Sequence, residues 1–205
     1  MTPKVRQSIV QKALLAQYAL LAYNIAEAIV SLFFGSLSGS IALVSFGRDS
    51  VVESLSTLIV TWRLRKTGKV SAQKEEEYER RAFRLVGFAF IALAVYVAFE
   101  SLRKLISGEV PDASIAGILI AVASIIFMPM LARYRHGIGH KIGSKSLVAD
   151  SKQTMLCAYM SAALLLGMGL NLLLGWWWAD PLAGLVISIL AFGEGKNALE
   201  GKTCC

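Results

Sequence analysis

The sequence predicts an all-α, polytopic membrane protein, and its composition is the first reason. Of the 205 residues, 56% are hydrophobic and 17% are charged, whereas charged residues make up about 25% of a typical soluble domain. The mean hydropathy is +0.59. A water-soluble fold of this size cannot bury so much apolar surface. The composition therefore excludes a soluble enzyme, a disordered chain and a secreted module held together by disulfide bonds.

Six apolar runs are the second reason for this fold class. A membrane-spanning helix needs about 20 mostly apolar residues. Six segments meet this requirement and predict one transmembrane domain over residues 1–205, with helices at 13–35, 40–62, 84–106, 114–133, 147–173 and 177–195. The start of the chain has no short apolar core followed by a cleavage site, so it is expected to be a cytosolic lead-in to the first helix. We expect the basic, glycine-containing segment 133–145 to be a loop.

The distribution of basic residues predicts the orientation of these helices. Most of the 21 Lys and Arg residues lie before the first run, between the second and third, between the fourth and fifth, or after the sixth. The positive-inside rule then places both termini in the cytosol. The three tryptophans at 176–178 fall at the outer interface, where indoles favour the headgroup layer. The net charge of +7 is explained by this orientation in the cell (inner) membrane, and no basic face indicates nucleic-acid binding.

Ionisable residues inside the predicted spans are the strongest functional signal. Such a residue costs at least about 2.5–3.5 kcal/mol in hydrocarbon, so it needs a partner or a function. The polar and ionisable residues of the spans are Asn24 and Glu27 in the first, Arg48, Asp49 and Glu53 in the second, Glu100 in the third, and Asp150, Lys152, Gln153 and Cys157 in the fifth.

Two of these pairs predict a metal site. Asp49 and Glu53 are four residues apart, as are Gln153 and Cys157, so each pair shares one helix face. At 1.5 Å per residue, Asp49 and Cys157 lie roughly 14–15 Å deep in a core about 30 Å thick. The two helices run in opposite directions, so the pairs can face each other around one small cation. Zinc commonly takes four such ligands, and a cysteine sulfur favours soft or borderline metals.

Structural explanations for these residues remain open. Arg48 could simply pair with Asp49, and Cys157 could be a packed thiol. Asp150 and Lys152 lie closer to the inner interface and could simply snorkel or form ion pairs. Glu27, Asp150 and Asn24 could form a secondary metal or proton site. Glu27 could equally be a polar clamp.

Other reactive side chains carry weaker signals. The odd number of cysteines indicates free thiols, and Cys204 and Cys205 could bind soft metal or form a plain tail. His136 and His140 could collect metal at the cytosolic mouth or simply be solvated. The sequence contains no P-loop, no HExxH motif and no Rossmann fingerprint. We expect neither enzymatic catalysis nor a prosthetic group.

Three stretches make the chain resemble the cation diffusion facilitator family: GSLSGSIALVSFGRDSVVESLS (35–56), SKSLVADSKQTMLCAY (144–159) and WWWADPLAGLVISIL (176–190). The resemblance implies a dimeric exporter of divalent metals, mainly zinc, in exchange for protons. The family's Asp/His-x-x-x-Asp pattern falls on Asp49 and Glu53, and its His-x-x-x-Asp pattern falls on Gln153 and Cys157. Both positions depart from the usual residues. Most members also carry a ferredoxin-like cytosolic domain after the sixth helix, and this chain resembles a short member without it.

The sequence thus predicts a transporter that exports a divalent transition metal, with zinc or cadmium first and cobalt next, by proton exchange. Its partners would be metal ions, protons, the lipid bilayer and a second copy bound through the membrane helices. Two alternatives stay open: a proton-coupled exporter of organic cations that uses Glu27, and a membrane metal sensor that does not transport.

Overall fold

The computed structural model describes residues 3–38, 41–108 and 115–201. Over these residues the chain is helical and contains no strand, which confirms the all-α prediction. The six helices are α1 (Pro3–Ser38), α2 (Ile41–Leu64), α3 (Ala72–Ser107), α4 (Ile115–Ile142), α5 (Lys145–Leu174) and α6 (Ala179–Leu199).

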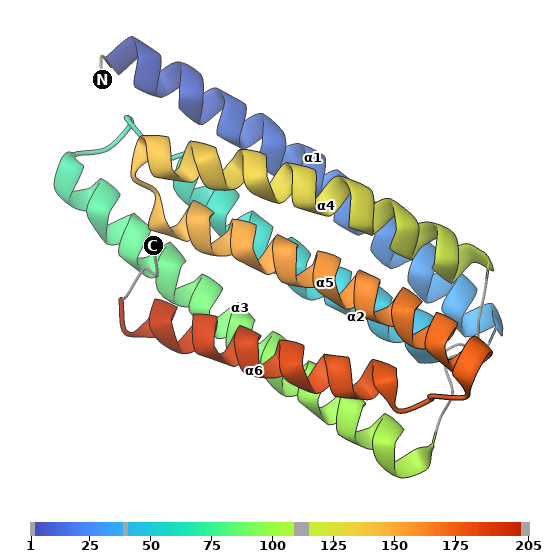
Figure 1. Cartoon of the computed structure of the whole chain (residues 1–205). Helices are drawn as coiled ribbons and strands as arrows, with labels where there is room; N and C mark the ends of the chain where they lie inside the picture. Colours follow the sequence, from blue (N-terminus) through green and yellow to red (C-terminus); the bar gives the residue numbers. More distant parts are fainter. Residues whose placement is uncertain (1–2, 39–40, 109–114, 202–205) are drawn as a thin grey trace.

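The helices lie side by side along a common long axis (Figure 1). The most extensive contacts join α3 to α6, α1 to α2 and α4 to α5. Helix α1 also contacts α4, and α2 contacts α5, so that α1, α2, α4 and α5 form one four-helix group. The α3–α6 pair packs beside this group through contacts of α3 with α2 and α5, and of α6 with α5.

Both chain termini lie at the same end of the bundle, which we call the terminal end (Figure 1). The connection 65–71 between α2 and α3 and the two-residue connection 143–144 between α4 and α5 also lie there. Gly143 adopts φ 68°, a left-handed conformation that favours glycine, and it ends α4 so that α5 can begin at Lys145.

Three helix boundaries differ from the sequence prediction. Helix α1 begins ten residues before the expected start at residue 13, and α3 begins twelve residues before residue 84. Helix α4 continues to Ile142, so the expectation of a loop over 133–145 is wrong. Apolar runs report the thickness of the bilayer, whereas a helix continues into water as long as its residues favour helix. The charged start of α3, AQKEEEYERRA, is rich in such residues.

Apolar side chains form a buried core, but large apolar side chains also cover the outer surface and polar side chains are buried. Large apolar side chains point outward on every helix, including Leu15, Phe99, Ile126 and Ile189, all more than half exposed. Four helices, α1, α3, α4 and α6, are long and apolar enough to cross a membrane. Helices α2 and α5 carry buried charged and polar residues instead, including Asp49 and Asp150. The fold is that of an integral membrane protein with a polar interior.

Candidate functional site

The four-helix group encloses a column of polar side chains. On α1, Gln17, Asn24 and Ser31 are fully buried and seven residues apart, so they share one helix face. The face of α2 that carries Asp49, Glu53, Ser56 and Thr57 is buried as well. The four residues predicted as metal ligands are each less than 5% exposed: Asp49, Glu53, Gln153 and Cys157.

Asp49 on α2 and Cys157 on α5 are brought together by the packing of their helices. The free Cys157 thiol lies beside the Asp49 carboxylate. One oxygen of this carboxylate, Oδ1, is buried without a hydrogen-bond partner. One predicted ligand from α2 and one from α5 therefore lie side by side. The Oδ1 atom of Asp49 can still accept a hydrogen bond.

Glu53 and Gln153 are buried in the same interior without hydrogen bonds. Both carboxylate oxygens of Glu53 and both polar atoms of the Gln153 amide lack a partner. Thr154 lies beside Glu53, but its hydroxyl donates to the Asp150 carbonyl oxygen at 3.3 Å and cannot satisfy the carboxylate as well. A buried polar group without a partner costs free energy, and a carboxylate costs most.

The predicted ligands do not form a closed coordination shell in this conformation. Among the described residues, no three His, Cys, Asp or Glu side chains are close enough together to hold a metal ion. The packing joins Asp49 to Cys157 and leaves Glu53 and Gln153 as unpartnered neighbours in the interior. Binding of one cation by all four residues stays a prediction.

Both carboxylate oxygens of Asp150 have hydrogen-bond partners, unlike those of Glu53. Asp150 forms a buried ion pair with Arg135 of α4, and both side chains are fully buried. Ser56 of α2 donates to its Oδ1 at 2.6 Å, and Gln17 of α1 donates to its Oδ2 at 3.2 Å. The guanidinium of Arg135 also donates to Thr154 at 2.8 Å. Asp150 thus links all four helices of the group.

Arg135 is the residue of this network that sequence reasoning missed. It was expected in a basic loop between the fourth and fifth spans, yet it lies in α4 and is fully buried. The flanking residues Gly137 and Gly139 are typical of a loop, but here they are helical. Gly139 allows close packing, because a Cβ at this position would lie 2.8 Å from Val148 of α5.

Glu27 on α1 is held by hydroxyl groups from three helices. Ser50 of α2 donates to its Oε2 at 2.7 Å, Ser124 of α4 donates to its Oε1, and Tyr23 donates to the same oxygen at 3.4 Å. Asn24, one residue after Tyr23, is fully buried and both of its polar atoms lack partners. In this conformation Glu27 is a polar clamp between α1, α2 and α4.

The remaining charged residues of the predicted spans are either exposed or held in ion pairs. Arg48 is exposed while Asp49 is buried, so the two side chains face different surroundings and do not pair in this conformation. Lys152 lies 3.0 Å from both carboxylate oxygens of Glu194 on α6. Glu100 pairs with Arg103 at 3.0 Å, as its position near the end of the third span predicts. Cys204 and Cys205 lie outside the described residues.

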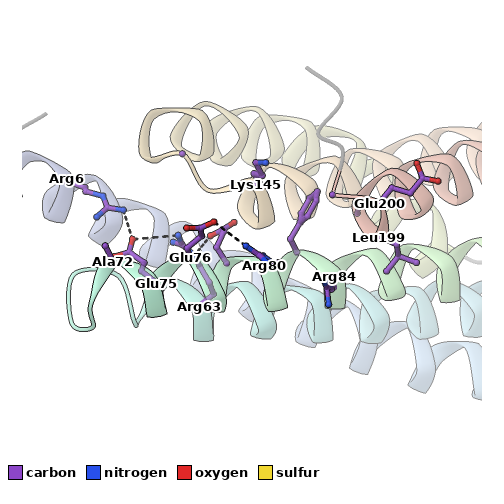
Figure 2. Close-up of a pocket in the computed structure, with 15 residues that line it drawn as sticks. Arg6, Arg63, Ala72, Glu75, Glu76, Arg80, Arg84, Lys145, Leu199 and Glu200 are labelled. Carbon is purple, nitrogen blue, oxygen red and sulfur yellow. Dashed lines mark hydrogen bonds and ion pairs between the residues drawn. The ribbon is translucent and has the colours of Figure 1, made fainter.

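An ion-pair cluster joins the helices at the terminal end (Figure 2). Arg63, at the end of α2, contacts Glu75 and Glu79 of α3, and Arg6 of α1 also pairs with Glu75. Glu79 further accepts a hydrogen bond at 2.6 Å from the Ser146 backbone N–H, in the first turn of α5. These contacts border a pocket of about 560 Å³. This cluster was not found from the sequence, because the partners come from different helices.

The fold and its interior define the class: an integral membrane protein of helices whose buried core holds unpartnered carboxylate and amide groups. The chain belongs to the cation efflux family of membrane transporters, since the model of the cation efflux transmembrane domain matches residues 18–199. The resemblance seen in the sequence is thereby confirmed.

Three relatives show the range of this similarity. An uncharacterised transporter of Synechocystis sp. is 25% identical over 190 residues, which cover 89% of this chain and 61% of the relative. The magnetosome protein MamB of Magnetospira sp. is 27% identical over 171 residues, covering 82% and 58%. The cadmium, cobalt and zinc/H(+)-K(+) antiporter of Bacillus subtilis is 24% identical over 196 residues, covering 93% and 61%. The chain spans about three fifths of the length of these relatives.

Proposed function

We propose that the protein exports a divalent transition metal from the cytosol in exchange for protons, with zinc and cadmium as the first candidates and cobalt as the next. The observation that carries this proposal is the set of buried, unpartnered atoms on α2 and α5: both oxygens of Glu53, both polar atoms of Gln153 and one oxygen of Asp49. Membership of the cation efflux family and the name of the Bacillus subtilis relative support it.

The chemistry of these groups suits such a cargo. Two carboxylates, an amide oxygen and a thiolate offer hard and soft ligands together, which favours a borderline metal such as zinc. The Cys157 thiol lies beside Asp49, and it must lose its proton to bind a metal. The metal would therefore displace this proton, and a proton arriving from the other side of the membrane would displace the metal. Glu53 and Gln153 must turn toward Asp49 and Cys157 to complete the site.

The position of Glu27 favours metal transport over export of organic cations. Three hydroxyl groups already donate to its carboxylate, so a cationic organic substrate would have to replace them. A buried carboxylate with these donors is suited to hold α1, α2 and α4 together. We therefore place Glu27 and Asn24 beside the path of the metal and not among its ligands.

The proposed orientation places the terminal end in the cytosol, in the inner membrane of a cell, with two copies joined through their membrane helices. The basic residues of the connection 65–71 and of the last turns of α4 support this orientation under the positive-inside rule. A cysteine introduced at the exposed Lys69 should react with an impermeant maleimide only from the cytosolic side.

Asp49→Ala tests the ligand assignment. We expect metal flux into proteoliposomes to fall to the level of protein-free liposomes, because the carboxylate that meets Cys157 is lost. The measurement is uptake of zinc, cadmium, cobalt and manganese, with a pH-sensitive dye on the opposite side. Glu100→Gln is the matched control, since it removes a carboxylate paired outside the interior and should retain flux. Normal transport by Asp49→Ala, or its failure to fold, would refute the assignment.

Glu53→Gln tests the coupling to protons. Because ligands must be deprotonated, metal binding by the unaltered protein should weaken as the pH falls from about 7.5 to about 5.5. The substitution removes one titratable ligand and keeps its shape, so affinity at neutral pH should drop and the pH dependence should flatten. Isothermal titration at several pH values, with proton release followed in weak buffer, measures both effects. Binding that is independent of pH, without proton release, would favour a channel or a sensor.

A further inference from the structure

His136 and His140 of α4 lie one helical turn apart near the terminal end, and their rings are in edge-to-face contact. Their Nε2 atoms are 3.1 Å apart and the ring centroids are 4.6 Å apart. Two imidazole nitrogens that bind one metal at 2.0–2.1 Å and about 100–110° apart are separated by roughly 3.1–3.4 Å. The pair therefore already has the spacing that two ligands of a single metal ion require.

The tautomer of His136 is set by a neighbouring helix. Ser151 of α5 donates its hydroxyl proton to the Val148 carbonyl oxygen at 2.6 Å. Its oxygen is then left to accept from Nδ1 of His136 at 3.2 Å, which places the ring proton on Nδ1 and leaves Nε2 with a free lone pair. An N–H···O contact of this kind, which orients the ring, is typical of histidines that bind metal.

The charges and the access around the pair are compatible with a cation. His140 is exposed and His136 is partly buried, so the Nε2 atoms can be reached from solvent. A Cβ at Gly137 would meet no atom within 4 Å, which indicates open space beside the pair. The charged groups that act on His136 are its partner His140 and, more weakly, Lys152. The charge of Lys152 is offset by Glu194, whose two oxygens lie 3.0 Å from Nζ.

We propose that His136 and His140 form a two-imidazole site for a divalent transition metal, separate from the interior between α2 and α5. Without a metal, the Nε2–H of His140 donates to the Nε2 lone pair of His136. Metal binding requires the other neutral tautomer of His140, in which the ring proton has moved to Nδ1, so that both Nε2 lone pairs can bind the ion and water completes the coordination. Imidazole ligands suit copper, nickel, zinc and cobalt, and affinity should rise along this series toward copper. The site does not depend on the transport activity proposed above.

The test uses the untagged 205-residue chain with interior ligands and thiols removed by four substitutions: Asp49→Ala, Cys157→Ser, Cys204→Ser and Cys205→Ser. This background should bind one equivalent of zinc, measured by competition with a chromogenic chelator. His140→Gln should weaken the binding at least about 10-fold, and Ser151→Ala about 10-fold, as expected for loss of a ligand and of its orienting partner. The spectrum of bound copper(II) should lose one nitrogen coupling in His140→Gln.

A register-shifted variant is the matched control. The double change His140→Lys with Lys141→His keeps the composition of α4 but moves the second imidazole off the shared face, so it should bind as weakly as His140→Gln. Lys141→Gln alone should bind normally. Because both changed positions are exposed, these variants should fold. Equal zinc affinity in the background and in the register-shifted variant, or an unchanged copper spectrum in His140→Gln, would overturn the proposal.

Discussion

Asp150 and Glu53 are both buried carboxylates of the same four-helix group, yet their surroundings are opposite. Asp150 receives Arg135, Ser56 and Gln17, so its charge and both oxygens are compensated. Neither oxygen of Glu53 has a hydrogen-bond partner. Burial alone therefore does not distinguish a structural acid from a candidate ligand. The distinction lies in the partners, because a satisfied ion pair has no capacity left for a cargo ion.

The largest expected difference between the two acids is in stability. Arg135→Ala leaves Asp150 buried without its counter-charge, which should cost about 3–5 kcal/mol of unfolding free energy. Glu53→Gln removes a charge that has no partner, so its effect should stay within about 1 kcal/mol. Reversible unfolding in mild detergent, with helicity followed by circular dichroism, compares the two variants. Equal destabilisation by both changes would show that Glu53 is also structural.

A smaller effect is expected on metal preference at the unpartnered site. Cys157→Asp replaces a soft thiolate by a hard carboxylate, which favours manganese over cadmium. We expect the ratio of cadmium to manganese affinity to fall at least about 10-fold, with folding retained. Cys157→Ser is the control for the loss of the sulfur alone. If isothermal titration gives the same ratio for the altered and unaltered proteins, the thiol does not contact the metal.

The smallest effect is expected at the Glu27 clamp. Ser124→Ala removes one of the hydroxyl groups that donate to this carboxylate and leaves those of Ser50 and Tyr23. Loss of one hydrogen bond should cost about 1 kcal/mol of stability, with metal flux in proteoliposomes close to normal. A large loss of flux at unchanged stability would instead place Glu27 on the path of the proton or the metal.

The number of helices could be predicted from the sequence because apolar runs of about 20 residues are a direct consequence of bilayer thickness. Helix ends could not be predicted, since hydropathy falls at the membrane surface while α3 and α4 continue through charged residues to different points. The terminal-end cluster was missed for a related reason. Arg63 and Glu79 are recognisable as a pair only when α2 and α3 are placed side by side.

The interior was partly predictable from helix periodicity. The spacing of four places Asp49 and Glu53 on one face, and the spacing of seven along Gln17, Asn24 and Ser31 carries the same signal for α1. The partner of Asp150 could not be found in this way. Arg135 lies fifteen residues away on another helix, and which acid it pairs with depends on how α4 packs against α5.

The network around Asp150 also has a mechanical consequence. Separating α5 from α1, α2 or α4 would break a buried contact to this one carboxylate, so the four helices are fastened together as a single block. Any motion of this block as a unit would take place along the seam where it meets α3 and α6. Gly87 and Gly195 let the backbones of α3 and α6 approach closely, so these two helices form a tightly packed pair on the other side of the seam. The ion pairs Arg63–Glu79 and Lys152–Glu194 cross the seam and hold the two groups of helices together.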